Sequence, residues 1–158
     1  MDNIELGKRY DEIIDRCVSI FEAKTKDYGP TWLFFRDESF VDQLWIKARR
    51  IRTLEENGDE SLVGEGRADE YLGIVNYGII MLMRMQNPEI FPSPDAVVAD
   101  TDAYHRLGID DMKQAYLRAF ASVKALMERK NHDYGGKIIL IFSTVSVIIR
   151  GICGKIFA

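Results

Sequence analysis

Apolar residues recur at helical spacing in four separate stretches of this chain, and no stretch before residue 136 alternates in the way of a half-buried strand. Gly29-Pro30 is expected to end the first helix, because Gly adopts the left-handed conformation easily and Pro cannot continue a helix. The buried face of that helix is predicted to consist of Tyr10, Ile13, Ile14, Cys17, Val18 and Phe21.

The second stretch predicts a helix that opens at Ser39, a good N-cap residue, and ends at Asn57-Gly58. Its buried face is expected to comprise Phe40, Leu44, Ala48 and Ile51.

A third helix is expected from Arg67 to Gln86, where Asn87-Pro88 stops it, and a last one from about Asp110. Three of the four prolines fall between these two helices, which indicates a connector. The whole pattern predicts a small all-α domain.

The end of the first helix recurs at the end of the last one. Residues 22–29 read E-A-K-T-K-D-Y-G, and residues 128–135 read E-R-K-N-H-D-Y-G. Five identities at one offset indicate a duplication. We therefore interpret residues 1–87 as a first repeat, 88–109 as a connector and 110–135 as a truncated second repeat. The tail, 136–158, has no Asp or Glu and is rich in Ile and Val, so we interpret it as non-homologous and irregular or strand-prone.

Composition narrows the classes of function. The 158 residues are 47% hydrophobic and 29% charged, which suits one folded domain. The formal net charge of −4 argues against binding duplex nucleic acid directly, although a small nucleotide needs only a few local cations. No signal peptide is recognisable, and no apolar run reaches the roughly 20 residues that span a bilayer. A cytoplasmic protein without a membrane span is expected.

The element K-x-x-D-Y-G at residues 24–29 has two interpretations. As a helix stop, its Gly follows the helix, its Lys complements the helix dipole and its Asp bonds its own turn. As a binding element, Asp27 contacts a metal ion or a sugar hydroxyl, while Tyr28 or Trp32 stacks on a base. Turn chemistry explains each residue type, which favours the structural interpretation.

The densest basic run occupies residues 47–52. In a helix, Lys47 and Arg50 flank the apolar face on one side. They either belong to a solvated charged surface or hold phosphates, for which guanidinium geometry is well suited. Both interpretations remain open.

An acidic cluster precedes the third helix. Glu65 and Asp69 are four residues apart and Glu70 follows, so these carboxylates could hold Mg²⁺, a hard ion that prefers oxygen ligands. They could equally be an acidic first turn that complements the helix dipole. Asn76 is a polar amide on a largely apolar helix and therefore needs a partner.

Together, these motifs resemble the nucleotide modification associated domain 1 family. The resemblance rests on K-x-x-D-Y-G followed by Trp, on D-Q-L-x-I-K-x-x-R-I at 42–51, and on an acidic helix start that leads into Asn-Tyr at 76–77. It covers about residues 10–86, with a partial second match at 112–135, and it implies a role in nucleotide metabolism. The chain is more loosely similar to the all-α nucleoside triphosphate pyrophosphohydrolases, in which E-x-x-D pairs hold Mg²⁺. That similarity would require Asp at the position of Gly73, so it implies slow or absent turnover.

We therefore expect a protein that binds a nucleoside or deoxynucleoside phosphate. The residues expected to bind it are Lys47, Arg50, Asp27, Tyr28, Trp32 and Asn76. Mg²⁺-dependent hydrolysis is a further expectation, with Glu65, Asp69 and Glu70 on the metal and Glu70 as the catalytic residue. The alternative is a non-catalytic helical interaction or dimerisation module, and a homo-oligomer is compatible with either.

Overall fold

The computed structural model describes residues 3–58 and 66–133. Within these ranges every regular element is a helix and no strand occurs, so the all-α prediction is confirmed. The tail predicted to be strand-prone lies outside the described residues. The elements are α1 (Asn3–Tyr28), η1 (Thr31–Phe34), α2 (Asp37–Glu56), α3 (Arg67–Gln86), α4 (Pro94–Ala99), α5 (Thr101–Arg106) and α6 (Ile109–Asp133).

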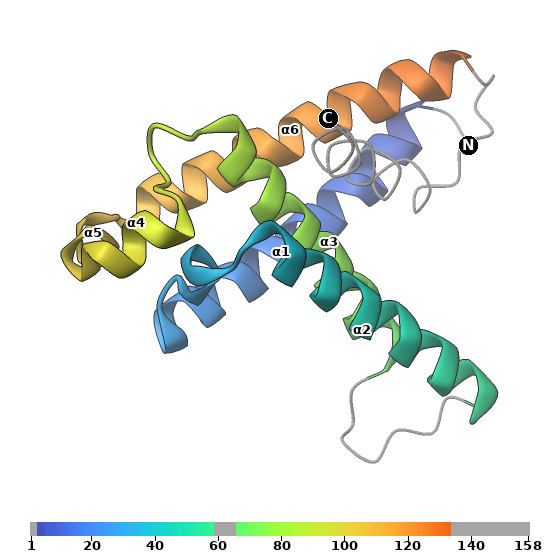
Figure 1. The fold of residues 1–158 in the computed structure, drawn as a ribbon. Coiled ribbons are helices and arrows are strands. Elements are labelled where there is room, and N and C mark those ends of the chain that lie inside the picture. Colours follow the sequence, from blue (N-terminus) through green and yellow to red (C-terminus); the bar gives the residue numbers. More distant parts are fainter. Residues whose placement is uncertain (1–2, 59–65, 134–158) are drawn as a thin grey trace.

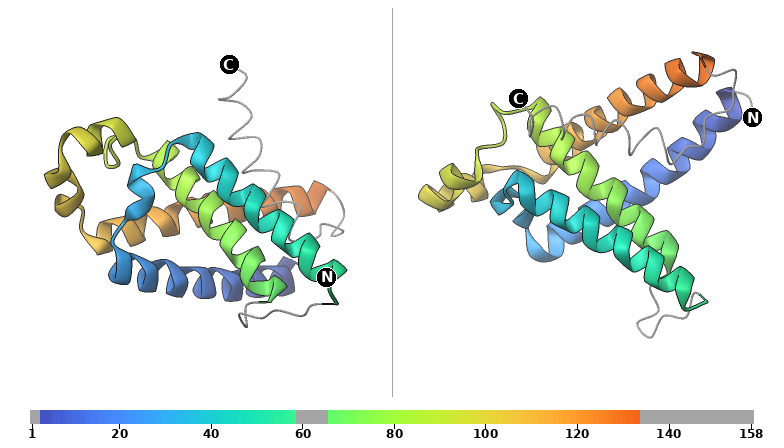
Figure 2. Two further views of the ribbon diagram at one scale, coloured as in Figure 1. Left: turned by 60° about the horizontal axis from the view of Figure 1, so that its bottom comes forward. Right: turned by 45° about the vertical axis from the view of Figure 1, so that its right-hand side comes forward.

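Two pairs of antiparallel helices cross each other (Figure 1). In the first pair, the start of α6 meets the end of α1, where Lys113 Nζ lies 2.7 Å from Glu22 Oε1. Further along, Lys124 Nζ lies 2.6 Å from Asp11 Oδ1. The second pair is α2 and α3, in which α3 contacts α2, α1 and α6 (Figure 2). Side chains of α3 can therefore meet residues from every long helix.

Aromatic rings fill the crossing point of the two pairs. Phe21 of α1 stacks on Tyr116 of α6 with ring centroids 4.3 Å apart. Phe120 packs edge-on against Tyr116 at 5.1 Å and against Tyr10 at 6.3 Å. Large buried aromatic side chains contribute much apolar area and prefer these geometries, so they fix how α1 and α6 sit together.

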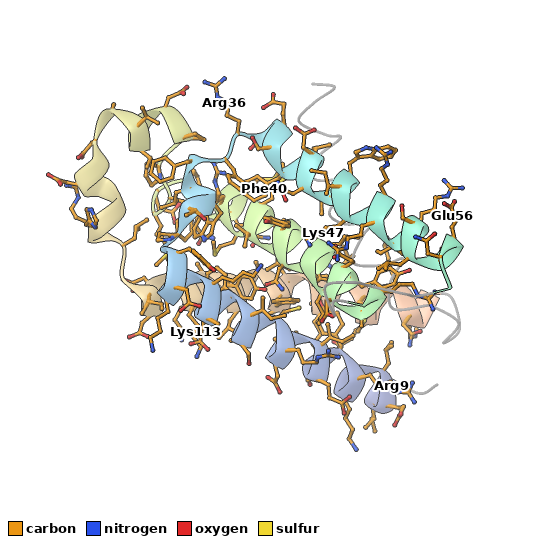
Figure 3. The ribbon with its side chains drawn as sticks, turned by 90° about the horizontal axis from the view of Figure 1, so that it is seen from below. Arg9, Arg36, Phe40, Lys47, Glu56 and Lys113 are labelled. Atoms are coloured by element: carbon orange, nitrogen blue, oxygen red, sulfur yellow. The ribbon has the colours of Figure 1, made fainter. Side chains whose placement is uncertain are left out.

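The structure corrects two details of α2. Arg36 occupies the N-cap position that was predicted for Ser39, and the helix begins at Asp37, two residues before Ser39. Phe40 and Ile51 are buried as predicted, but Ala48 is exposed and Lys47 is half-buried instead. Figure 3 shows Phe40 and Lys47 between α2 and α3. Lys47 faces α3, where its Nζ lies 3.1 Å from Glu70 Oε2.

The connector contains two short helices that the sequence interpretation did not include. In α4, Ser93 caps the helix by accepting a hydrogen bond from the amide of Ala96, and Pro94 occupies the first turn. In α5, Asp100 accepts one from the amide of Asp102. None of the described helices is long and apolar enough to cross a membrane. The first residue of α6 lies as many positions after the first residue of α1 as Glu128 lies after Glu22. The duplication itself stays a prediction.

Candidate functional site

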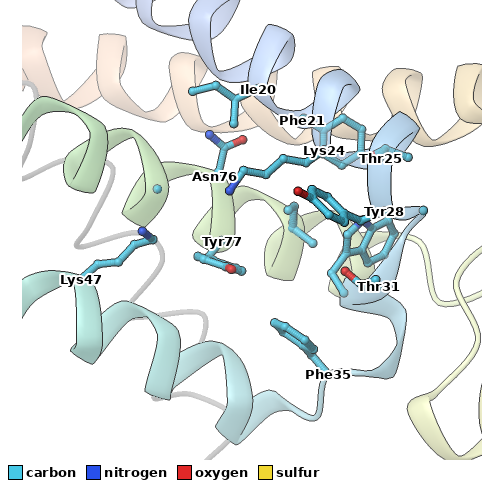
Figure 4. A pocket seen from close by; sticks show the side chains of 14 residues that line it. Ile20, Phe21, Lys24, Thr25, Tyr28, Thr31, Phe35, Lys47, Asn76 and Tyr77 are labelled. Carbon is cyan, nitrogen blue, oxygen red and sulfur yellow. The ribbon is translucent and has the colours of Figure 1, made fainter. Parts of the chain in front are cut away.

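A cavity of about 230 Å³ opens where the end of α1 and η1 face α2 and α3. Figure 4 shows Lys47 and the Tyr77 ring on one side of the cavity, the rings of Tyr28 and Phe35 on the other, and the Lys24 side chain extending between them. Among the described residues that line it, none is acidic. These residues are Ile20, Phe21, Lys24, Thr25, Tyr28, Gly29, Thr31, Trp32, Phe35, Lys47, Gly73, Asn76, Tyr77 and Ile80.

The turn after α1 forms one wall of the cavity. Gly29 has a φ of +69°, the left-handed conformation that lets the chain leave the helix and enter η1. Arg84 of α3 ties this segment down, because its Nη1 donates to the carbonyl of Phe35 at 2.7 Å and to that of Trp32 at 3.4 Å. The Arg84 guanidinium also lies over the Phe40 ring, 5.3 Å from its centroid.

The two aromatic residues predicted to stack on a base lie in different environments. Trp32 is buried and packs edge-on against Phe91 at 5.5 Å, and its indole N–H has no partner among the described residues. Tyr28 is 72% exposed and stands at the mouth. Trp32 therefore serves as a wall, whereas Tyr28 is accessible for stacking.

Lys47 reaches the cavity from α2 and forms an ion pair with a buried carboxylate. Glu70 of α3 is only 3% exposed, and its two oxygens are each engaged: Lys47 Nζ lies 3.1 Å from Oε2, and Arg50 Nε lies 3.1 Å from Oε1. On the way, the Lys47 side chain passes over Gly73, where an added Cβ would stand 2.4 Å from Lys47 Cε. Gly73 therefore provides the space in which Lys47 lies.

Asn76 has the partners that its place on an apolar helix requires. Its Nδ2 donates to the carbonyl of Leu72 at 3.0 Å, and its Oδ1 accepts a hydrogen bond from the hydroxyl of Tyr116. Burial raises the pKa of Tyr116 well above its usual value, so the phenol stays protonated and acts as the donor. This pair connects the cavity wall to α6.

The predicted metal ligands do not converge within the described part of the chain. Asp69 Oδ2 accepts from the amide of Gly66 at 3.0 Å and so caps the start of α3. Glu70 contacts Lys47 and Arg50, and Glu65 lies outside the described residues. Residues 3–58 and 66–133 contain no group of three side chains suited to holding a metal ion. The magnesium site stays a prediction.

The cavity thus brings together part of the predicted binding set, namely Tyr28, Trp32, Lys47 and Asn76. Asp27 and Arg50 do not line it. The sequence interpretation missed Lys24, Phe35 and Tyr77. Lys24 opens the K-x-x-D-Y-G element and Tyr77 closes the Asn-Tyr pair, so both signals were present in the motifs. Lys24 was interpreted as a residue that complements the helix dipole, so its place in the cavity was not predicted.

The cavity lies in a segment that carries a recognisable domain. Residues 24–85 match the family model of nucleotide modification associated domain 1. The predicted resemblance is confirmed over this range, which begins later than the expected residue 10. All the described lining residues except Ile20 and Phe21 fall within the matched residues 24–85. No curated protein and no solved structure matches the chain.

Proposed function

We propose that the cavity binds a nucleoside or deoxynucleoside phosphate. The observation that carries this proposal is that two lysine side chains and several aromatic rings line one cavity, within the segment that matches nucleotide modification associated domain 1. Aromatic side chains stack on bases of any sequence, and ammonium groups bind phosphate as point charges. The arrangement therefore offers each half of a nucleotide a complementary surface.

Individual roles follow from accessibility. Tyr28, at the mouth, and Tyr77, in the wall, present rings to the base. Lys24 and Lys47 face the phosphate from α1 and α2. Arg50 acts indirectly, because it shares Glu70 with Lys47 and so leaves Lys47 incompletely neutralised.

Mg²⁺-dependent hydrolysis by Glu70 stays a prediction. It would require the Glu70 carboxylate to exchange Lys47 and Arg50 for the metal ion. Asp69 would likewise have to leave the amide of Gly66. Binding needs neither change, and for that reason we place binding first.

Thermal shift and calorimetry test the proposal, because a ligand that binds the native state alone raises its apparent stability. We expect nucleotides to raise Tm, with and without Mg²⁺. Tyr28→Ala should raise the Kd for the nucleotide about 10-fold, because a base–aromatic stack contributes ~1–3 kcal/mol. Tyr71→Ala is the matched control, because Tyr71 is an exposed tyrosine of α3 outside the cavity. Absence of binding across a broad nucleotide panel would contradict the proposal.

A non-catalytic interaction module is the second candidate, and the surface of α2 favours it. Trp45 is 68% exposed, and Val41 and Ile46 beside it are also exposed. Exposed apolar clusters commonly mark contacts with other proteins. Light scattering on the full chain should then show a dimer that Trp45→Gln dissociates, while a monomer at all concentrations would exclude self-association.

A further inference from the structure

The charges around the cavity define what kind of anion it accepts. Lys24 has no ion-pair partner among the described residues, whereas Lys47 already contacts the Glu70 carboxylate. Since no described lining residue is acidic, the two lysines give the lining of the cavity a positive charge. An anionic group there would be bound directly by ammonium groups, in charge-assisted hydrogen bonds.

The size of the cavity limits the rest of the ligand. Pockets for drug-sized molecules enclose roughly 300–1,000 Å³, and this one encloses about 230 Å³. It therefore favours a small ligand that carries a single phosphate over one that carries a phosphate chain. A chain of three phosphates would have to extend out of the cavity, away from the lysine pair.

We infer that the ligand is a nucleoside monophosphate, with its single phosphate between Lys24 and Lys47 and its base against Tyr28 and Tyr77. This inference rests on the proposed nucleotide-binding function and narrows it to one phosphate. Lys24, which turn chemistry alone would explain, is then a ligand-binding residue. Its ammonium has no carboxylate partner within the described part of the chain, so a bound phosphate can pair with it.

Calorimetry on the full chain tests this inference with nucleosides, their 5′-monophosphates and their 5′-triphosphates in the presence of a chelator. We expect the monophosphate to bind at least about 10-fold more tightly than the nucleoside, which lacks the charged group, and than the triphosphate, whose phosphate chain extends out of the cavity. Lys24→Gln should remove that preference. Lys26→Gln is the control, because Lys26 is exposed on the same helix outside the cavity.

The outcomes separate the two proposals. If a triphosphate or an unphosphorylated nucleoside binds as tightly as the monophosphate, the inference is wrong and nucleotide binding stands. The same conclusion follows if Lys24→Gln and Lys26→Gln behave alike. If no member of the panel binds, both the inference and the proposed function are wrong.

Discussion

The side chain of Lys47 lies against Gly73, so closely that a Cβ at position 73 would stand 2.4 Å from Lys47 Cε and 2.7 Å from its Nζ. A glycine inside a helix costs up to about 1 kcal/mol relative to alanine. At position 73 the glycine leaves room for the Lys47 side chain to extend from α2 to the Glu70 carboxylate and to the cavity. The similarity to pyrophosphohydrolases led us to interpret Gly73 as a missing metal ligand, whereas the structure shows that Lys47 occupies the space.

Gly73→Ala should separate binding from stability. The added methyl group pushes the flexible end of Lys47 out of its path, so we expect monophosphate affinity to fall about 10-fold, the loss of one charge-assisted contact. The gain in helix propensity offsets the lost ion pair, and the free energy of unfolding should change by less than about 1 kcal/mol. Calorimetry and urea unfolding measure the two effects.

Gly7→Ala is the matched control for that substitution. Gly7 also lies within a helix, and its added Cβ would meet nothing closer than Lys124 Cε at 4.0 Å. It should raise stability by up to about 1 kcal/mol without affecting affinity. Unchanged affinity in Gly73→Ala would show that Lys47 does not need this path to bind the ligand.

Glu70→Gln should destabilise the protein by about 2 kcal/mol. The substitution leaves two cations without their carboxylate, and breaking a fully buried pair costs ~3–5 kcal/mol. The Lys47 and Arg50 side chains are 23% and 38% exposed, so water compensates part of this loss. Urea unfolding should show a shifted midpoint with an unchanged slope.

The control for Glu70→Gln is Glu55→Gln, which removes an exposed ion pair with Arg67. Exposed pairs contribute ~0–1 kcal/mol, so this variant should resemble the unmodified protein. Equal effects of the two substitutions would refute a special role for the Glu70 cluster.

Arg84→Met should loosen the turn that carries Trp32. The substitution removes the guanidinium donor from the carbonyls of Trp32 and Phe35. The Trp32 carbonyl keeps the amide of Phe35, whereas the Phe35 carbonyl loses its 2.7 Å partner, and an unsatisfied acceptor costs ~1–3 kcal/mol. We expect a loss of about 2–3 kcal/mol in unfolding free energy. Arg118→Met, at an exposed site on α6, should cost far less. A comparable loss in both variants would contradict this role of Arg84.

The sequence predicted those parts of the fold that repeat over several helical turns. The third helix was predicted with its observed bounds, because a long apolar face ends at an unambiguous Asn87-Pro88 stop. The six-residue helices α4 and α5 were missed, since they are too short to show periodicity. Ala48 was placed inward because its spacing fits the apolar face, whereas the structure exposes it; the Lys47–Glu70 pair, 23 residues apart, was not predicted, since local spacing does not reveal it.

The sequence predicted part of the candidate site's residues, but only partly which residues they contact. The need of Asn76 for a hydrogen bond followed from its apolar surroundings, but Tyr116 lies 40 residues away on another helix. Glu70 was recognised as chemically important, yet its neighbours in space turned out to be cations. Long-range pairing of this kind depends on how α2, α3 and α6 pack, which local spacing does not encode.

The last prediction concerns pH and the thiol of Cys17, which lies fully buried in α1. Burial raises the pKa of Cys17 to about 12, whereas a cysteine in an unfolded chain has a pKa of about 8.5. The native state therefore keeps its proton at a pH where the unfolded chain loses it. The stabilisation associated with the protonated thiol is complete below about pH 8.5 and is lost progressively as pH rises toward about 12.

Urea unfolding of the unmodified protein and of Cys17→Ala, each at pH 7, 9 and 10, measures this contribution. Burial and the nearby Cys17 raise the pKa of Tyr10 and Tyr116, and burial, the larger cause, keeps both protonated in the native state of either protein over this pH range. The difference between the two unfolding free energies therefore reports the thiol. We expect that difference to be constant up to about pH 8.5 and to shrink by about 1.4 kcal/mol for each pH unit above it. A difference that stays constant to pH 10 would show that the Cys17 thiol ionises as readily in the native state as in the unfolded chain.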